Sequence, residues 1–136
     1  MEHSCGGVIR YQDMFLLLHY GLGHWGFVKG HVETGETPLQ TFLREAQEES
    51  GLTADNLTII PGFQEKIHYV YKKGTQIMYK EVNYFLADSN KMIITLSSEH
   101  TAYQWLPYQE ALETLTFPED QEILEKAYAF LNAPKP

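Results

Sequence analysis

Apolar residues in the first part of the chain form short runs separated by polar and glycine-rich stretches. Residues 5–11 and 14–20 are strand-sized, and the polar pair Gln12-Asp13 between them is typical of a tight turn. A third apolar run, residues 25–28, follows a stretch rich in glycine. This pattern predicts short strands at the start of the chain.

The next segment has the period of an amphipathic helix. Its apolar side chains recur at steps of three and four residues, which places them on one helical face. They are Leu39, Phe42, Leu43 and Ala46. Thr37 suits the N-cap, Pro38 suits the first turn, and Gly51 accepts the left-handed conformation that ends many helices. We therefore expect a helix over residues 38–50.

Strand-like segments resume after this helix, and two helices close the chain. The expected strands cover residues 57–60, 63–71, 77–87, 92–96 and 101–106, with a hairpin turn at residues 72–75. A proline precedes or opens each expected closing helix, at residues 108–115 and 118–131. Strands, a helix, further strands and closing helices indicate an α+β fold in which helices cover both sides of a mixed sheet.

Composition sets the class of protein. A chain of 136 residues suits one domain over residues 1–136, and a hydrophobic content of 43% is enough for an ordinary core. The single Cys5 has no internal disulfide partner. No apolar run approaches a membrane span, and no cleavable leader is evident, so we expect a cytoplasmic protein without a membrane partner. No feature of the sequence indicates an oligomeric state.

The formal net charge of −8 narrows the choice of partners. Such an acidic surface repels the nucleic-acid backbone, so general nucleic-acid binding is not expected. It also repels a free polyphosphate. If the substrate is a polyphosphate, metal ions and a few local cations must reverse the sign of the charge inside the site.

Three carboxylates lie close together on the expected helix. Glu45, Glu48 and Glu49 are spaced i, i+3 and i+4, so they share a face that is separate from the apolar one. Like charges on adjacent turns repel, so this face is either well solvated or holds a cation. Hard divalent ions such as Mg²⁺ take oxygen ligands and keep several waters. Arg44 lies one turn from Glu48 and can orient its carboxylate.

The helix and the loop before it carry a long series of residues at fixed spacings. They are Gly30, Glu36, Arg44, Glu45, Ala46, Glu48, Glu49, Gly51 and Leu52. The series resembles the Nudix box, in which a glycine and a glutamate precede an Arg-Glu pair, a Glu-Glu pair and a final glycine, and it matches every fixed position. The Nudix family hydrolyses nucleoside diphosphates linked to another group and uses divalent metal ions.

This resemblance implies an α/β/α sandwich around the mixed sheet and a Mg²⁺ or Mn²⁺ ion held by Glu45, Glu48 and Glu49. It implies that Glu36 braces the loop, with Arg44 grouped with the catalytic residues. A carboxylate must accept the proton of the attacking water. Glu45 in the box and Glu99 in a later loop are both candidates, because family members differ on this point.

Further segments resemble the diadenosine tetraphosphate hydrolases within this family. They are HWGFVKGHVETGE, LTIIPGFQEKIHYV and LSSEHTAYQWL. The resemblance implies that the substrate contacts Lys29, His31, Tyr69, Lys80 and Phe117. Val28 departs from the family, which usually has proline at this position.

Charge and stacking account for these substrate contacts. A tetraphosphate carries about four negative charges, more than one or two metal ions cancel, so His31 and Lys80 are expected to bind phosphates. Tyr69 and Phe117 can sandwich an adenine, since stacking on an aromatic ring contributes roughly 1–3 kcal/mol. The simpler alternatives are a loop-bracing His31, a solvated Lys80 and aromatic rings that pack in the core.

The sequence therefore predicts a metal-dependent pyrophosphohydrolase that splits the small molecule diadenosine tetraphosphate asymmetrically into ATP and AMP. One alternative is removal of pyrophosphate from RNA 5′ ends, and another is hydrolysis of ordinary or modified nucleoside triphosphates. RNA would favour a basic track, which the net charge opposes. A nucleotide-binding sensor without turnover is expected to have lost a box carboxylate, and none is missing.

Overall fold

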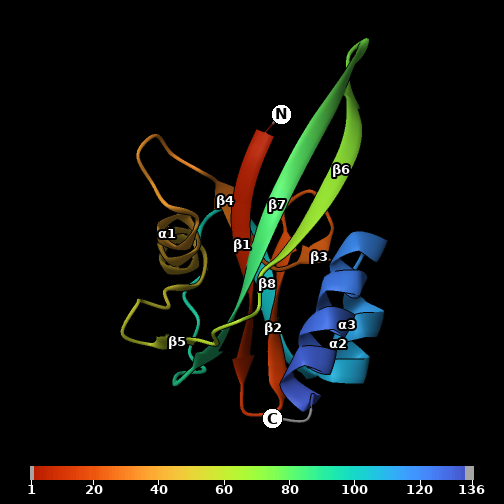
Figure 1. The fold of residues 1–136 in the computed structure, drawn as a ribbon. Coiled ribbons are helices and arrows are strands. Elements are labelled where there is room, and N and C mark those ends of the chain that lie inside the picture. The colour runs from red at the N-terminus through yellow and green to blue at the C-terminus, as the bar shows by residue number, and fades with distance from the viewer. Residues whose placement is uncertain (1, 134–136) are drawn as a thin grey trace.

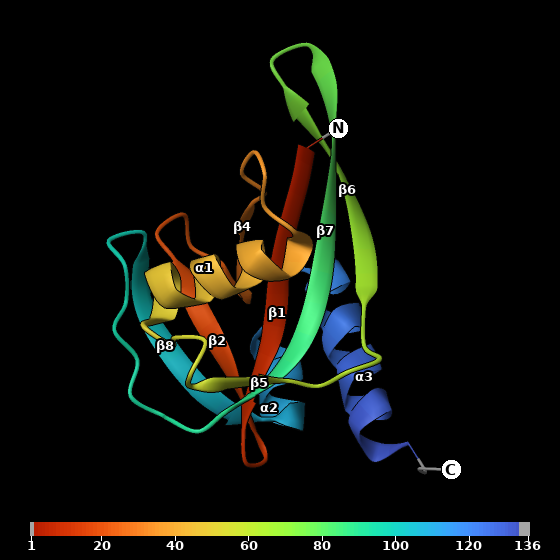
Figure 2. The ribbon, with the colours of Figure 1, turned by 60° about the vertical axis from the view of Figure 1, so that its left-hand side comes forward.

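The computed structural model describes residues 2–133, which form one mixed sheet with helices on both faces (Figures 1 and 2). The strands are β1 (Glu2–Tyr11), β2 (Met14–Tyr20), β3 (Trp25–Gly26), β4 (Val28–His31), β5 (Leu57–Ile59), β6 (Glu65–Lys73), β7 (Gln76–Ser89) and β8 (His100–Pro107). The helices are α1 (Pro38–Ser50), α2 (Tyr108–Thr114) and α3 (Pro118–Asn132). Figure 1 shows α1 on one side of the sheet and α2 and α3 on the other, which confirms the expected α+β sandwich. No helix within the described range is long and apolar enough to cross a membrane.

The centre of the sheet is the parallel pair of β1 and β7, which runs from Glu2 opposite Lys80 to Arg10 opposite Asp88. Along the path β3-β2-β1-β7-β5 the other neighbours are antiparallel, and β4, β6 and β8 pair with β1, β7 and β2. Because β4 places His31 opposite Ser4, the polar ends of β4 and β7 meet beside the start of β1. The topology therefore brings His31 and Lys80 to the same end of the sheet.

Two hydrophobic cores fill the space between the layers, and alternation along the strands assigns residues to them. Phe15 and Leu17 of β2 face the core under α3, whereas Leu16 and Leu18 face the core under α1. On β7, Val82, Tyr84 and Leu86 share one face of the strand and are fully buried in the first of these cores. Full burial of one such side chain contributes roughly 1.5–3 kcal/mol.

The ends of α1 form as the sequence predicts. Thr37 and Gln40 make a reciprocal capping box, and Gly51 ends the helix with φ = 77°. One residue of the predicted apolar face is misplaced, because Leu39 is 36% exposed and lies at the solvent edge of the first turn. Thr41 and Glu49 are buried instead. The face of α1 that packs against the rest of the protein therefore includes Thr41 and Glu49 and leaves Leu39 at its edge.

One predicted strand does not form, and another is divided into two. Residues 92–96 form a loop, because the backbone bonds to α1 and to a side chain: Thr95 N donates to Ser50 O at 2.9 Å, and Trp105 Nε1 donates to Met92 O at 2.9 Å. The predicted strand 25–28 is split into β3 and the start of β4, and Val28 is a buried strand residue opposite Gly7.

The β6–β7 hairpin is the most extended feature of the structure. Figures 1 and 2 show it projecting beyond the helices, and the predicted turn contains Gly74 with φ = 65°. Its paired residues alternate between the two faces of the sheet. Tyr69 lies opposite Lys80, so the base of the hairpin presents both side chains toward the face that α3 covers in part.

Gly7 sets the distance between β1 and α1. A Cβ atom at this position would lie 2.2 Å from Cε1 of the buried Phe42 ring. We expect Gly7→Ala to lower the free energy of unfolding by about 1–3 kcal/mol, because the helix must move away from the sheet. Urea denaturation measures the change. Gly21→Ala is the control, since its nearest neighbour would be 3.5 Å away, and equal stability of the two variants would contradict the packing argument.

Candidate active site

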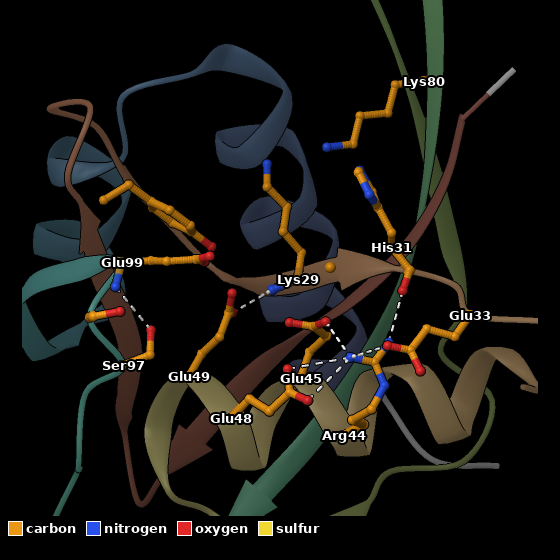
Figure 3. A pocket seen from close by; sticks show the side chains of 13 residues that line it. Lys29, His31, Glu33, Arg44, Glu45, Glu48, Glu49, Lys80, Ser97 and Glu99 are labelled. Atoms are coloured by element: carbon orange, nitrogen blue, oxygen red, sulfur yellow. Dashed lines mark hydrogen bonds and ion pairs between the residues drawn. The ribbon is translucent and has the colours of Figure 1, made fainter.

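A cavity of about 490 Å³ lies between the carboxylate face of α1 and the ends of β4 and β7 (Figure 3). Its lining contains most of the residues that the sequence analysis selected, from segments far apart in the chain. These are Lys29, His31, Arg44, Glu45, Glu48, Glu49, Lys80 and Glu99. Tyr20, Gly30, Glu33, Ser97 and Ser98 complete it.

Arg44 ties the loop before α1 to the helix itself. Its Nε and Nη2 atoms donate to the Glu36 carboxylate at 2.7 and 3.0 Å, and Nη2 also donates to the carbonyl of His31 at 2.9 Å. Nη1 donates to Glu45 at 2.7 Å and lies 3.3 Å from Glu48 Oε2. The planar guanidinium therefore fixes three carboxylates and one backbone turn together.

Glu36 braces the loop from the other side, as the sequence analysis expects. Its Oε1 accepts the Glu33 backbone N–H and the Thr41 hydroxyl, each at 2.9 Å. The bonds from Arg44 hold the pKa of Glu36 well below its usual 4.5, at about 2, and the Glu33 N–H adds to this effect. Glu36 is therefore a structural anion whose acceptor oxygens are already bonded to donors within the protein.

Gly30 allows Glu45 to lie against β4. A Cβ atom on Gly30 would be 2.0 Å from the Glu45 carboxyl carbon and 2.2 Å from its Oε1. Any side chain at this position would displace that carboxylate. Position 30 therefore requires glycine, because the Glu45 carboxylate lies so close to β4.

Glu49 carries a carboxylate into a poorly solvated position. Its side chain is only 6% exposed, and its one hydrogen bond comes from the Lys29 backbone N–H at 3.1 Å. Burial raises the pKa of Glu49 to about 8, and the nearby charges of Glu45 and Glu99 add to the shift. Burial also raises the pKa of Glu45. This part of the cavity therefore disfavours the charged form of Glu49, whose Oε2 lies 3.9 Å from His100 Nε2.

These carboxylates fit a divalent cation in chemistry, although their present positions are spread apart. As the side chains stand, no three Asp, Glu, His or Cys residues between positions 2 and 133 are arranged to hold a metal ion. The reason is that Arg44 draws Glu45 and Glu48 toward itself, while Glu49 turns to the Lys29 N–H. A cation would stabilise the ionised form of Glu49, and carboxylate oxygens are suitable ligands for Mg²⁺. The predicted ligand set of Glu45, Glu48 and Glu49 therefore stays a prediction.

The opposite side of the cavity is cationic. Figure 3 shows the side chains of Lys29, Lys80 and His31 extending into the space away from α1. Burial lowers the pKa of Lys80, and the neighbouring Lys29 ammonium lowers it further. Both lysines line the same cavity, an arrangement that suits an anionic ligand, and the nearby carboxylates of Glu2 and Asp120 act on the pKa of Lys80 in the opposite direction.

Glu99 lies on the loop before β8 and reaches toward Glu49 (Figure 3). Its backbone is held at both ends, since its N–H donates to Ser97 Oγ at 3.3 Å and its carbonyl accepts from Gly21 N at 3.0 Å. The structure therefore brings Glu99 from more than forty positions away to the carboxylates of α1. Its side chain has no recorded partner among the residues that the structure describes, unlike Glu45.

A second cavity of about 400 Å³ adjoins the first and shares Tyr20, Lys29 and Lys80 with it. Tyr69 and Phe117, the two predicted aromatic contacts, both line it. The Lys29 ammonium lies 5.3 Å from the centre of the Tyr69 ring, a cation–π distance. The structure therefore places predicted phosphate-binding and base-binding residues in two connected spaces.

Sequence analysis missed Tyr20 and His24 as cavity residues. Their rings stack at 4.5 Å with an interplanar angle of 9°, and the His24 ring lies 5.0 Å from the Phe117 ring. Tyr20 is the last residue of an apolar strand, where aromatic residues usually pack in a core, so the sequence pattern did not indicate a cavity residue. The adjoining glycine-rich loop was the available signal, because such loops often border binding sites.

The fold and this site together define the class of protein. The NUDIX domain family model matches residues 3–127, which include β1, the box and α3 up to its last turns. The chain therefore belongs to the Nudix hydrolase family.

The similar proteins narrow the class further. The chain is 43% identical over 121 residues to a bis(5′-nucleosyl)-tetraphosphatase (asymmetrical) of Sus scrofa, which covers 86% of this chain and 80% of that protein. It is 36% identical over 139 residues to the Caenorhabditis elegans protein of the same name, with 96% and 98% coverage. The structure matches the crystal structure of a C. elegans Ap4A hydrolase binary complex with a TM-score of 0.86, at 32% identity and with 96% and 98% coverage.

The low pKa of Glu36 predicts how stability depends on pH. A carboxylate whose pKa is lower in the folded state than in the unfolded state contributes stability above the unfolded-state pKa, and loses it as the pH falls toward the folded value. We expect wild type to be more stable than Glu36→Gln at neutral pH, and the difference to shrink between pH 4.5 and about 2. Urea denaturation across this range measures it. A difference that is the same at every pH would contradict the assignment.

Proposed function

We propose that this protein hydrolyses diadenosine tetraphosphate asymmetrically, releasing ATP and AMP. The relatives named above are asymmetrical bis(5′-nucleosyl)-tetraphosphatases by name, and the matches cover 80% and 98% of their lengths. The observation that carries the proposal is the connection between two cavities, one lined by carboxylates and lysines and the other by aromatic rings. A nucleoside joined to a phosphate chain requires such a pair of spaces.

The proposed binding mode follows the charges. An adenine stacks in the second cavity between Tyr69 and Phe117, and its phosphates pass Lys29 and Lys80 into the first. Those two lysines offset part of the charge of the phosphate chain, and His31 lies at the same end of the sheet. The scissile phosphoanhydride then lies beside the carboxylates of α1.

The proposed reaction is attack of a water molecule on a phosphorus atom of the chain. A new P–O bond forms, the bridging P–O bond breaks, and its electron pair leaves with the departing nucleotide. Glu99 accepts the proton of the water, because Glu45 is bonded to Arg44 at 2.7 Å and Glu99 points into the cavity. A Mg²⁺ or Mn²⁺ ion at Glu45, Glu48 and Glu49 would lower the pKa of the water and neutralise phosphoryl charge.

Product analysis tests the proposal directly. The pure protein is incubated with dinucleoside polyphosphates, nucleoside triphosphates, triphosphorylated RNA and ADP-ribose, in Mg²⁺ and ¹⁸O-labelled water. We expect diadenosine tetraphosphate to give equal amounts of ATP and AMP, with the label in one of them, which identifies the attacked phosphorus. Formation of two ADP molecules, or preferred cleavage of another substrate, would contradict the proposal.

Glu49 provides a test of the carboxylate site. Glu49→Gln retains the shape of the side chain and its bond to the Lys29 N–H, but removes its negative charge. We expect kcat to fall by about a hundredfold or more with little loss of stability. Glu125→Gln on α3 is the matched control, because Glu125 is exposed and lies outside both cavities. Full activity of Glu49→Gln at saturating Mg²⁺ would refute the role.

Lys80 tests recognition of the phosphate chain. Lys80→Met keeps the aliphatic stem and removes the charge that faces the cavity. We expect kcat/KM for diadenosine tetraphosphate to fall about tenfold more than for the shorter ADP-ribose, because more phosphate charge is left uncompensated. Lys72→Met, in the projecting hairpin, is the control. Equal losses on the two substrates would reject the assignment.

A further inference from the structure

Asp120 is a fully buried carboxylate that lies outside the lining of the catalytic cavity. It lies in the first turn of α3 with 0% exposure. Its Oδ1 accepts two phenolic hydroxyl groups, from Tyr69 at 2.9 Å and from Tyr84 at 3.2 Å. Burial of a carboxylate is costly unless donors or a dipole offset it. The helix N-terminus and the two hydroxyl groups offset part of this cost, while the buried Oδ2 has no hydrogen-bond partner among the described residues.

The two tyrosines occupy different surroundings. Tyr84 is fully buried in the core under α3, where it packs edge-on against Phe27 at 5.9 Å. Tyr69 lies on β6 at the boundary of that core and lines the second cavity. Asp120 therefore connects a wall of the cavity to a rigid part of the interior.

The same helical turn also supplies the other predicted aromatic contact. Phe117 is the N-cap of α3, and its carbonyl accepts the Asp120 N–H at 3.1 Å. Phe117 lines the second cavity together with Tyr69. One turn of helix thus holds one ring directly and anchors the other through a hydrogen bond, so it sets how the two rings lie relative to each other.

We propose that Asp120 is a positioning residue that fixes Tyr69 relative to Phe117 and so determines the width of the slot for the nucleobase. This inference rests on the proposed function. Because the Tyr69 hydroxyl donates its proton to Asp120, Tyr69 offers the base its ring face and no hydrogen-bond donor. The slot therefore recognises a base by stacking, which tolerates either purine.

Matched variants separate this role from a merely structural one. Tyr69→Phe and Tyr84→Phe each remove one hydroxyl bond to the same oxygen of Asp120 and keep the ring. Asp120→Ala removes the acceptor, and Asp120→Asn restores an acceptor oxygen. Each variant is assayed with diadenosine tetraphosphate and with methyl tetraphosphate, which has the phosphate chain without a base, as substrate or as competitive inhibitor.

For diadenosine tetraphosphate, we expect Tyr69→Phe and Asp120→Ala to raise KM about tenfold with kcat nearly unchanged, in line with loss of a hydrogen bond to a charged group. Asp120→Asn is expected to lie close to wild type, and Tyr84→Phe to lose stability without a change in KM. Binding of methyl tetraphosphate is expected to be the same in all variants.

Two results would overturn the inference, and they are distinguishable. If wild type forms ATP and AMP but Tyr69→Phe changes KM for diadenosine tetraphosphate no more than Tyr84→Phe does, the positioning role is wrong and the proposed function stands. If wild type forms no ATP and AMP from diadenosine tetraphosphate, the proposed function fails, and the inference fails with it.

Discussion

The guanidinium of Arg44 is the interaction on which the site depends. Its donors reach Glu36 in the loop, Glu45 and Glu48 on the helix, and the backbone carbonyl of His31 on β4. A lysine has a single point of charge and no planar fork, so it would not satisfy these acceptors together. Arg44 thereby converts a group of mutually repelling carboxylates into a defined surface. The buried Glu49 lies beside that surface, where it accepts the Lys29 N–H and its Oε2 lies 3.9 Å from His100 Nε2.

Charge distribution explains how an acidic protein can bind an acidic substrate. The formal net charge is −8, yet Lys29 and Lys80 face each other across one cavity wall, and the pKa of Lys80 is lowered by burial and by Lys29. An anion that binds between these lysines relieves their repulsion. The carboxylates of the facing wall require positive charge for the same electrostatic reason. The lysine side of the site is stabilised by negative charge, which a polyphosphate supplies. The carboxylate side is stabilised by positive charge, which a divalent cation supplies.

Features encoded within a few residues could be predicted from the sequence, and features that depend on distant segments could not. The ends of α1 follow from Thr37 and Gly51 alone, and the acidic face of that helix follows from its spacing. Residues 92–96 have the composition of a strand, but their backbone groups bond to the end of α1 and to the Trp105 side chain, and they form no strand pairing. Asp120 gave no local signal, because its role arises only when β6, β7 and α3 come together.

The most direct measurement of the central claim is cation binding to the free protein. Electron paramagnetic resonance of Mn²⁺ titrated with wild type, with a Glu45→Gln/Glu49→Gln double variant and with Glu125→Gln reports the bound fraction without any turnover. The account predicts a wild-type site whose affinity falls by more than about tenfold in the double variant and is unchanged in Glu125→Gln. Equal Mn²⁺ affinity in wild type and the double variant would contradict it.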